Sequence, residues 1–287
     1  MQYPSLREVR RCFSAHHPLH AAYYFAPEHD GCYAQLGLEP GPMAYFAGRA
    51  APLGAVGAGV VSAVFYNFHP ALVARVLPRA WQHAAPAQIL QVRLNIVDRC
   101  LHRLLGAQAL QSAELAEAAE LATQAAASCR RHGRPMYSAN ADLPVPDVAH
   151  LKLWHAITQL REHRGDGHVG VLLQADLDGI EALVTDTATG TNWKPYFLQT
   201  NRGWSAQDWA DAQARLRERG LLDAAGELTE QGFALRRQIE AETDRLDSGP
   251  YRALGAAGTR RLTELAGTLA KRALAAGALP LQHLGKR

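Results

Sequence analysis

Apolar side chains recur at helical spacing along most of the chain. From Pro86 to Leu105 they stand three to four positions apart, and the alanine-rich segment from Ser112 to Arg131 keeps the same period. A shorter apolar segment, Pro70 to Trp81, contains Pro78, which must end or kink a helix. The pattern therefore predicts a mainly α-helical protein.

A proline-punctuated segment divides the chain. Residues 139–146 read ANADLPVP, a composition typical of a linker. We therefore predict two domains. Residues 1–140 would form an N-terminal, helical half, and residues 141–287 a C-terminal half that ends in a further helix.

The second half begins with a helical pattern and a predicted turn. Asp147 is placed to cap a helix that stops at Gly165. The glycines Gly165 and Gly167 favour a tight turn, after which a second helical region is expected over residues 168–184. Residues 185–199 have no clear periodicity and are expected to be irregular or weakly extended.

A helix, a short two-stranded turn and a second helix follow in order. Ser205 is placed to cap the helix AQDWADAQARLRERG, residues 221–228 favour two short strands around a turn, and Thr229 precedes the helix EQGFALRRQIEAETDRL. Over about forty residues this segment resembles the winged helix-turn-helix of the MarR group. The resemblance implies a fold and says little about activity.

A short segment of the N-terminal half is similar in sequence to a segment of the C-terminal half. Gly54-Ala55-Val56-Gly57 and Gly167-His168-Val169-Gly170 each follow an arginine-bearing segment and precede apolar helical sequence. Two winged-helix-like halves arranged as a pseudo-dimer, with extra helices, would explain this layout. Chance similarity over so short a match is the alternative.

Charge argues against a nucleic-acid partner. The 287 residues include 30 basic and 27 acidic side chains, a net charge of +3 that indicates neither DNA nor a membrane surface. The helix that would enter the major groove begins with Gln207, Asp208 and Asp211, and its first arginine is Arg215. The turn at residues 223–227 has no basic residue. We predict a winged helix kept as a scaffold, with DNA binding unlikely.

The cysteines and the apolar segments indicate a cytoplasmic protein. Cys12, Cys32, Cys100 and Cys129 lack metal-ligand spacing and fit reduced thiols. The N-terminus has no apolar core of a secretory signal. Residues 50–68 are uncharged, but their prolines and glycines favour a buried helix, closely packed through the glycines, over a membrane span.

The densest polar cluster is LREHRGDGH, residues 160–168. Asp166 is expected to orient His168, which would then act as general acid or base, while Arg164 would bind an anion. The alternative is structural: Asp166 caps the next helix, and the arginines lie near the end of the preceding one.

Other segments add candidate residues for the same site. His20 and Glu28 could form a second proton-transfer pair, and Arg49 could bind an anion with Tyr45 nearby. Taken singly, His20 is more often a satisfied core histidine and Asn67 a helix cap. Together they predict one apolar pocket between the halves. Its expected members are His20, Glu28, Tyr45, Arg49, Asn67, Arg164, Asp166, His168 and Trp204.

No motif identifies a cofactor or a metal. The chain has no nucleophile elbow, no zinc-protease motif and no P-loop. His20, Glu28, Asp166 and His168 would form a reasonable N/O metal site only if folding brings them together. Whether a metal or another cofactor binds stays open.

Several longer motifs resemble a family of helix-turn-helix or winged-helix-like proteins from high-GC Gram-positive bacteria, the Actinobacteria. They are YFAGRAAPLG, FYNFHP, GRPMYSANADLPVP, LWHAITQLREHRGDGH, RGWSAQDWADAQARLRERGLL and ALRRQIEAETDRL, and the resemblance runs from about His20 to Pro280. It implies a shared pocket rather than a shared DNA surface, because many matching polar residues lie outside the wing. These include His20, Glu28, Tyr45, Arg49, Asn67, Arg161, Glu162, Arg164, Asp166, His168 and Trp204. Gly48, Met136 and Tyr137 depart from the family pattern.

Three functions remain open. The leading hypothesis is a small-molecule-binding protein that acts as an enzyme of specialised metabolism, with His/Asp acid–base chemistry and anion binding by arginine. The alternative is a ligand-responsive, MarR-like transcription regulator that binds DNA. The third is a structural interaction module. The substrate, the reaction class and a homodimeric state are left open by the sequence.

Overall fold

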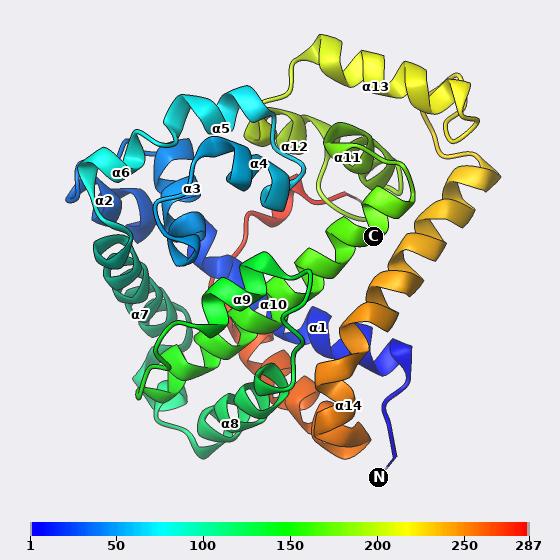
Figure 1. The fold of residues 1–287 in the computed structure, drawn as a ribbon. Helices are drawn as coiled ribbons and strands as arrows, with labels where there is room; N and C mark the ends of the chain where they lie inside the picture. Colours follow the sequence, from blue (N-terminus) through cyan, green and yellow to red (C-terminus); the bar gives the residue numbers. More distant parts are fainter. Residues whose placement is uncertain (1, 286–287) are drawn as a thin grey trace. The chain divides into compact units, whose positions relative to one another are not determined.

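The structure, a computed structural model, describes residues 2–285 and is built from helices (Figure 1). Within these residues, β structure is limited to two isolated bridges, Trp193 with Leu284 and Leu222 with Leu228. The prediction of a mainly α-helical protein is therefore confirmed. The described cysteines are free thiols, three of them buried and Cys129 partly exposed.

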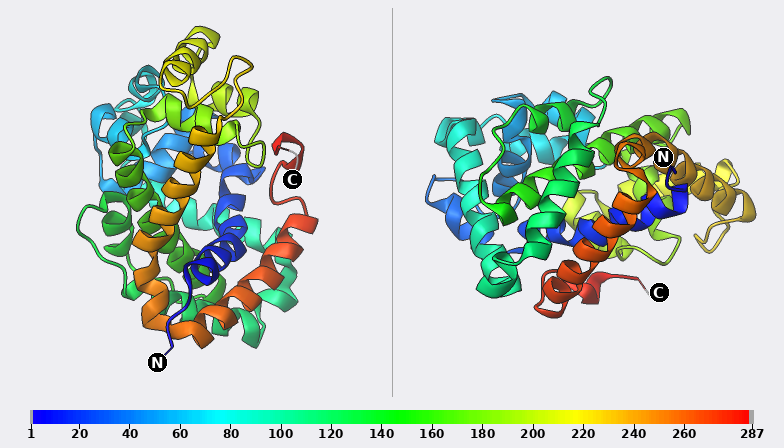
Figure 2. Two further views of the ribbon diagram at one scale, coloured as in Figure 1. Left: turned by 90° about the vertical axis from the view of Figure 1, so that its right-hand side faces the viewer. Right: turned by 90° about the horizontal axis from the view of Figure 1, so that it is seen from below.

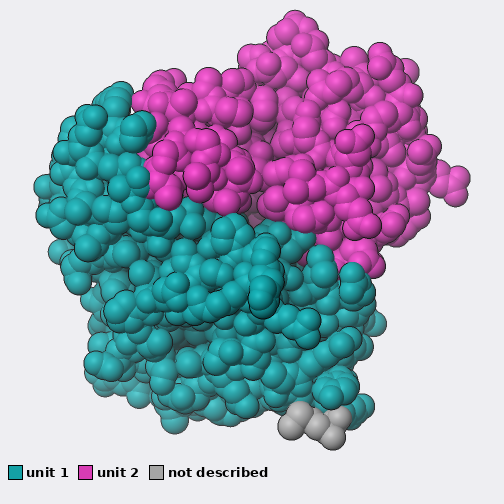
Figure 3. Space-filling model, viewed as in Figure 1, with its two compact units in different colours: residues 1–55, 78–167, 244–279 teal, residues 56–77, 168–243, 280–287 magenta. Residues whose placement is uncertain are grey.

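The chain forms two compact units, coloured separately in Figure 3. Unit 1 comprises the residues up to Ala55, Pro78–Gly167 and Asp244–Leu279, and unit 2 comprises Val56–Leu77, His168–Thr243 and the residues from Pro280 onward. Two long helices have residues in both units: α10 (Ala149–Gln174) and α14 (Glu230–Ala275). The predicted pairing of two sequence halves as a pseudo-dimer stays a prediction.

Unit 1 is organised around α7, which packs on α2, α3 and η2. Its first helix has a full N-terminal capping box, because Ser5 accepts from the Glu8 amide while the Glu8 carboxylate accepts from the Ser5 amide. Pro86 occupies the first turn of α7, where a missing N–H costs nothing. The other elements of unit 1 are α1 (Leu6–Ala21), η1 (Ala22–Phe25), α2 (Glu28–Ala34), α3 (Pro42–Ala50), η2 (Ala51–Leu53), α6 (Ala80–His83), α7 (Pro86–Leu110), α8 (Ala113–Ala127) and α9 (Pro135–Ala141).

Unit 2 contains the predicted helix, turn and helix. Ser205 caps α13 in a capping box with Asp208, the single bridge between Leu222 and Leu228 forms the turn, and α14 begins at Glu230. Before this motif in the chain, α11 packs on both α12 and α13. The elements of unit 2 are α4 (Ala58–Phe65), α5 (Pro70–Val76), α11 (Gly179–Thr187), α12 (Pro195–Arg202), α13 (Ala206–Glu218) and η3 (Leu281–His283).

The turn predicted at Gly165 and Gly167 is wrong, because α10 continues through both glycines to Gln174. A Cβ at Gly167 would lie 2.5 Å from Nη1 of Arg134, so this glycine makes room for a guanidinium rather than for a turn. The second helical region is also divided differently. α11 begins only at Gly179, and α12 occupies part of the stretch expected to be irregular.

The long helix α14 is interrupted inside unit 1. Gly255 has a φ of 75° and a ψ of 167°, which breaks the helix. Figure 2 (left) shows the orange part of the chain, which includes the end of α14, turning sharply. Positive φ at this point favours glycine, which has no Cβ to clash.

The apolar segment 50–68 differs from its prediction as a buried, glycine-packed helix. It forms η2 and the short helix α4, Val60 is 49% exposed, and a Cβ at Gly57 or Gly59 would meet open space. Among residues 2–285, no single helix is both long and apolar enough to cross a membrane. The bent pair Pro42–Leu53 and Ala58–Phe65 passes that test by length and composition alone.

Candidate functional site

Two guanidinium groups meet one buried carboxylate in unit 1. Glu162 on α10 has a side chain that is only 2% exposed. Arg49 of α3 donates from Nε to Oε1 at 3.2 Å and from Nη2 to Oε2 at 3.1 Å, a two-point contact. Arg161 of α10 donates from Nη1 to Oε2 at 2.6 Å. Although burial alone would raise it, the two arginines lower the pKa of Glu162 to about 2.

Helical spacing explains how these groups come together. Tyr45 and Arg49 are four residues apart and lie on one face of α3, with Nη1 of Arg49 3.5 Å from the Tyr45 hydroxyl. Trp154, Thr158 and Glu162 follow the same spacing on α10. Both helices present these residues on buried faces, so their polar atoms must bond to one another.

Aromatic rings extend the cluster to the end of α1. The His20 ring stacks on Trp154, with centroids 5.7 Å apart, and meets Tyr24 edge-on at 5.4 Å. Tyr24 in turn lies 5.3 Å from Tyr45. We call the group Arg49, Arg161, Glu162, His20, His17, Tyr24 and Tyr45 the arginine cluster.

The hydrogen bonds assign the tautomer of His20. The Thr158 hydroxyl donates to the carbonyl of Trp154 at 2.7 Å, so its oxygen accepts from Nδ1 of His20 at 3.1 Å. Nε2 of His20 is then the deprotonated nitrogen, and it is buried without a hydrogen-bond partner. Burial and the nearby Arg161 guanidinium hold the pKa of His20 well below 6.5, so the ring is neutral at pH 7.

His17 adds a second neutral ring. Its Nδ1 is likewise buried and unbonded, and burial together with Arg161 and Arg164 lowers the pKa of His17 to about 4. The arginine cluster thus combines two guanidinium groups and one carboxylate with two neutral imidazole rings.

Glu28 lies outside this cluster. Its carboxylate, on α2, accepts from Nε and Nη2 of Arg103 on α7 at 2.8 and 3.2 Å. The Arg103 side chain is 38% exposed, and that of Glu28 is 21% exposed. The pairing of Glu28 with His20 stays a prediction, and the structure gives Glu28 a different partner.

Arg164 and Asp166 of α10 have other partners in unit 1. Nη1 of Arg164 lies 2.8 Å from Asp244 on α14. The Asp166 carboxylate accepts from the amides of Tyr137 at 2.9 Å and Met136 at 3.4 Å, at the start of α9. Burial raises the pKa of Asp166 to about 6. Asp166 therefore caps α9, a structural role close to the alternative considered from the sequence.

Three predicted site residues belong to unit 2. Nδ1 of His168 lies 2.9 Å from the Thr243 hydroxyl, and the indole N–H of Trp204 donates to the Asn67 carbonyl at 3.0 Å. Asn67 and Trp204 are thus brought together, but through the backbone of Asn67. Residues two apart on a helix do not face each other, so the continuous α10 leaves Asp166 and His168 on different sides.

The structure therefore brings His20, Tyr45 and Arg49 together around Arg161 and Glu162, two residues that entered the sequence analysis only through the family resemblance. Arg161 and Glu162 lie in the motif LREHRGDGH, inside the helix that was predicted to stop at Gly165. That helix already places Thr158, Arg161 and Glu162 on one face, but helical spacing does not show that Arg49 of another helix meets them. A single pocket for all nine predicted residues stays a prediction.

The helix-turn-helix segment exposes both basic and acidic side chains. Arg215 and Arg219 are engaged with Glu181, and Arg215 also with Asp178, within unit 2. Arg217 is exposed on α13, and its Nε donates to the Asp223 carbonyl. The same segment also exposes four acidic residues, Asp211, Glu218, Asp223 and Glu227.

One comparison with known proteins, the match to a family model, fits the helix, turn and helix seen in unit 2. No curated protein and no solved structure matches the chain. A family model described as a helix-turn-helix family matches residues 9–280, which is nearly the whole chain. The finer resemblance to the MarR group and to proteins of Actinobacteria stays a prediction. The chain belongs to this helix-turn-helix family.

Proposed function

We propose that the protein binds a small anionic molecule at the arginine cluster. One observation carries the proposal: Arg49 and Arg161 converge on the single carboxylate of Glu162 in a buried site. Two guanidinium groups carry one positive charge more than the single carboxylate between them can neutralise. That excess charge suits a carboxylate or phosphate, which guanidinium groups bind at two points.

The unbonded nitrogen of His20 indicates a further chemical group that the ligand should carry. A buried acceptor without a partner costs free energy, and a ligand hydroxyl or amine that donates to Nε2 would recover it. The rings of Trp154, Tyr24 and Tyr45 around His20 favour a flat, apolar body. The expected ligand thus combines an anionic group, an O–H or N–H donor and an aromatic or similarly flat frame.

Within the arginine cluster, His20 is the residue that could perform the acid–base chemistry predicted from the sequence. Its neutral ring can accept a proton at Nε2, whereas Asp166 is occupied as a cap and Glu28 is paired with Arg103. We propose that an enzyme of this kind would use His20 as its base and the arginines to hold the anion. His168, the base predicted from the sequence, belongs to unit 2, where its Nδ1 lies 2.9 Å from the Thr243 hydroxyl.

Binding can be tested with hydroxybenzoates, unsubstituted benzoate and inorganic phosphate as probes. Calorimetric titration should show hydroxybenzoate binding more tightly than benzoate, because only the former can donate to His20. Arg161→Gln keeps the Arg49–Glu162 contact and should weaken binding about 10-fold or more, the loss expected for a charge-assisted hydrogen bond.

Arg103→Gln is the matched control, since Arg103 also pairs with a glutamate in unit 1 but lies at the surface. It should bind the probes as the wild type does. If no probe binds at millimolar concentration, or if Arg161→Gln and Arg103→Gln behave alike, the proposal is wrong.

Family membership favours a second candidate, a DNA-binding regulator. The exposed acidic residues of the helix-turn-helix segment oppose it, because duplex DNA carries one negative charge per ~1.7 Å. A mobility-shift titration decides between the two. A regulator would form a complex that weakens steeply with salt and is lost in Arg217→Gln, whereas a scaffold would form none at physiological salt.

A further inference from the structure

A second polar cluster of unit 1 lies between α7 and α10. Asp98 and His102 are four residues apart on α7 and share a face, and His150 lies in the first turn of α10. Nε2 of His150 is 2.6 Å from Oδ1 of Asp98, and Nε2 of His102 is 3.7 Å from the same oxygen. One donor atom from each of the three residues lies within 4.8 Å of the others.

These separations are close to those between the ligand atoms of a metal ion. Zn²⁺ binds imidazole nitrogen and carboxylate oxygen at about 2.0–2.1 Å, so neighbouring donors of a tetrahedral site lie about 3.3 Å apart. The observed 2.6 and 3.7 Å fall on either side of that length. Small side-chain rotations would equalise them without movement of the helices.

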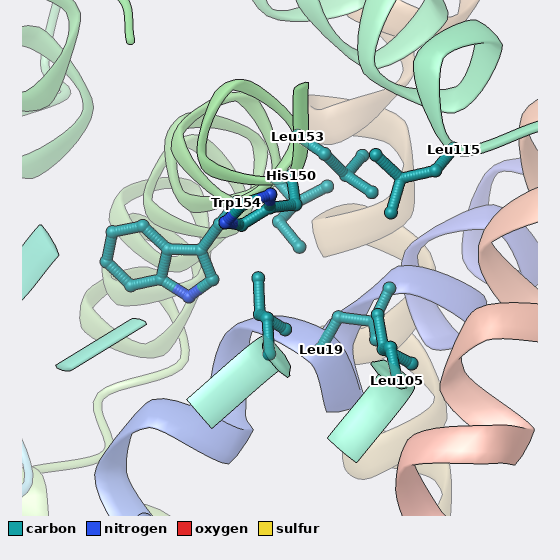
Figure 4. Close-up of a pocket in the computed structure, with 8 residues that line it drawn as sticks. Leu19, Leu105, Leu115, His150, Leu153 and Trp154 are labelled. Atoms are coloured by element: carbon teal, nitrogen blue, oxygen red, sulfur yellow. The ribbon is translucent and has the colours of Figure 1, made fainter. Parts of the chain in front are cut away.

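The three side chains differ in their exposure to solvent. The His150 side chain is 6% exposed and lines a small apolar pocket with Leu115 and Leu153 (Figure 4). That pocket, about 10 Å³, has room for no more than one water molecule, so it is no ligand site itself. Asp98 and His102 are 43% and 52% exposed. One ligand is thus fixed by packing, and solvent can reach the other two.

We propose that Asp98, His102 and His150 bind one divalent transition-metal ion, with Zn²⁺ preferred. Two imidazoles and one carboxylate suit this class of ion better than Mg²⁺ or Ca²⁺, which prefer oxygen donors. The ion links α7 to α10 within unit 1, and its fourth position takes a water molecule. The site is separate from the arginine cluster and does not depend on the proposed function.

The test uses the full chain, freed of any affinity tag and stripped with a chelator. Calorimetric titration with ZnCl₂ should give one equivalent of bound metal, and saturating Zn²⁺ should raise the melting temperature. Co²⁺ should give a tetrahedral visible spectrum without a thiolate charge-transfer band, which excludes binding by cysteine.

His102→Ala is the decisive variant, because His102 is exposed and its loss should leave the fold intact. Zn²⁺ affinity should fall at least 10-fold, and the gain in melting temperature should disappear. His132→Ala removes another exposed histidine of unit 1 and should change neither. The proposal is overturned if the wild type binds no stoichiometric metal, or if His102→Ala binds it as tightly as His132→Ala does.

Discussion

Replacement of Glu162 by glutamine should destabilise unit 1 far more than an equivalent change at the surface. The side chain of Glu162 is 2% exposed, and its carboxylate accepts from both Arg49 and Arg161. Glutamine has nearly the same shape but removes the charge, and its NH₂ group would face a guanidinium donor. Two positive groups would then lack their shared counter-charge in a buried site.

The magnitude follows from the pKa of the carboxyl group. A fall from 4.5 to about 2 on folding corresponds to about 3 kcal/mol of stability, at about 1.4 kcal/mol for each pKa unit. Loss of one partner from a buried ion pair typically costs about 3–5 kcal/mol. The two values agree, so Glu162→Gln should reduce the free energy of unfolding by about 3 kcal/mol at pH 7.

The sign of the pH dependence is also fixed. Because the folded pKa is lower than the unfolded pKa, the ion pair contributes fully above about pH 4.5 and is lost as the pH falls toward 2. The difference in stability between the wild type and Glu162→Gln should therefore shrink over this range.

Urea unfolding followed by circular dichroism measures the effect, and hydrogen exchange in α3 and α10 assigns it to unit 1. Glu28→Gln is the matched control, since Glu28 forms a similar two-point contact with Arg103 at the surface. It should cost no more than about 1 kcal/mol. Equal costs for the two variants would refute the argument that burial makes the Glu162 contact strong.

Three further predictions concern local structure. Gly179→Ala should destabilise unit 2, because a Cβ at this position would collide with the carbonyl oxygen of Tyr66. Gly170→Ala lies on open helix surface and should stabilise unit 2 by about 0.5–1 kcal/mol. Thermal unfolding of the two variants compares these effects. Ser205→Ala should cost about 1 kcal/mol and increase hydrogen exchange at the start of α13, since the capping box is lost. Burial raises the pKa of Asp166 above its unfolded value, so ionisation of this group lowers the free energy of unfolding as the pH rises from about 4 to 6. Urea titrations at several pH values should show this fall in the wild type and not in Asp166→Asn.

The short-range features of this fold were readable from the sequence. Pro86 opens α7, and Ser205 with Asp208 caps α13, because both effects act within one helical turn. The mainly helical class follows in the same way from apolar spacing. His20, Tyr45 and Arg49 could be named as candidates because polar residues in apolar segments need partners.

Long-range contacts decided the rest. Two glycines indicated a turn, but a helix tolerates each for about 1 kcal/mol when tertiary contacts compensate. Here Gly167 admits the Arg134 guanidinium, and Asp166 bonds to the first amides of α9. The pairing of Arg49 with Glu162 joins residues 113 positions apart. The sequence by itself determined the mainly helical class and which residues are chemically able to form a site. Only the tertiary structure decided which of them meet, because burial and ion pairing depend on distances that chain neighbours do not encode.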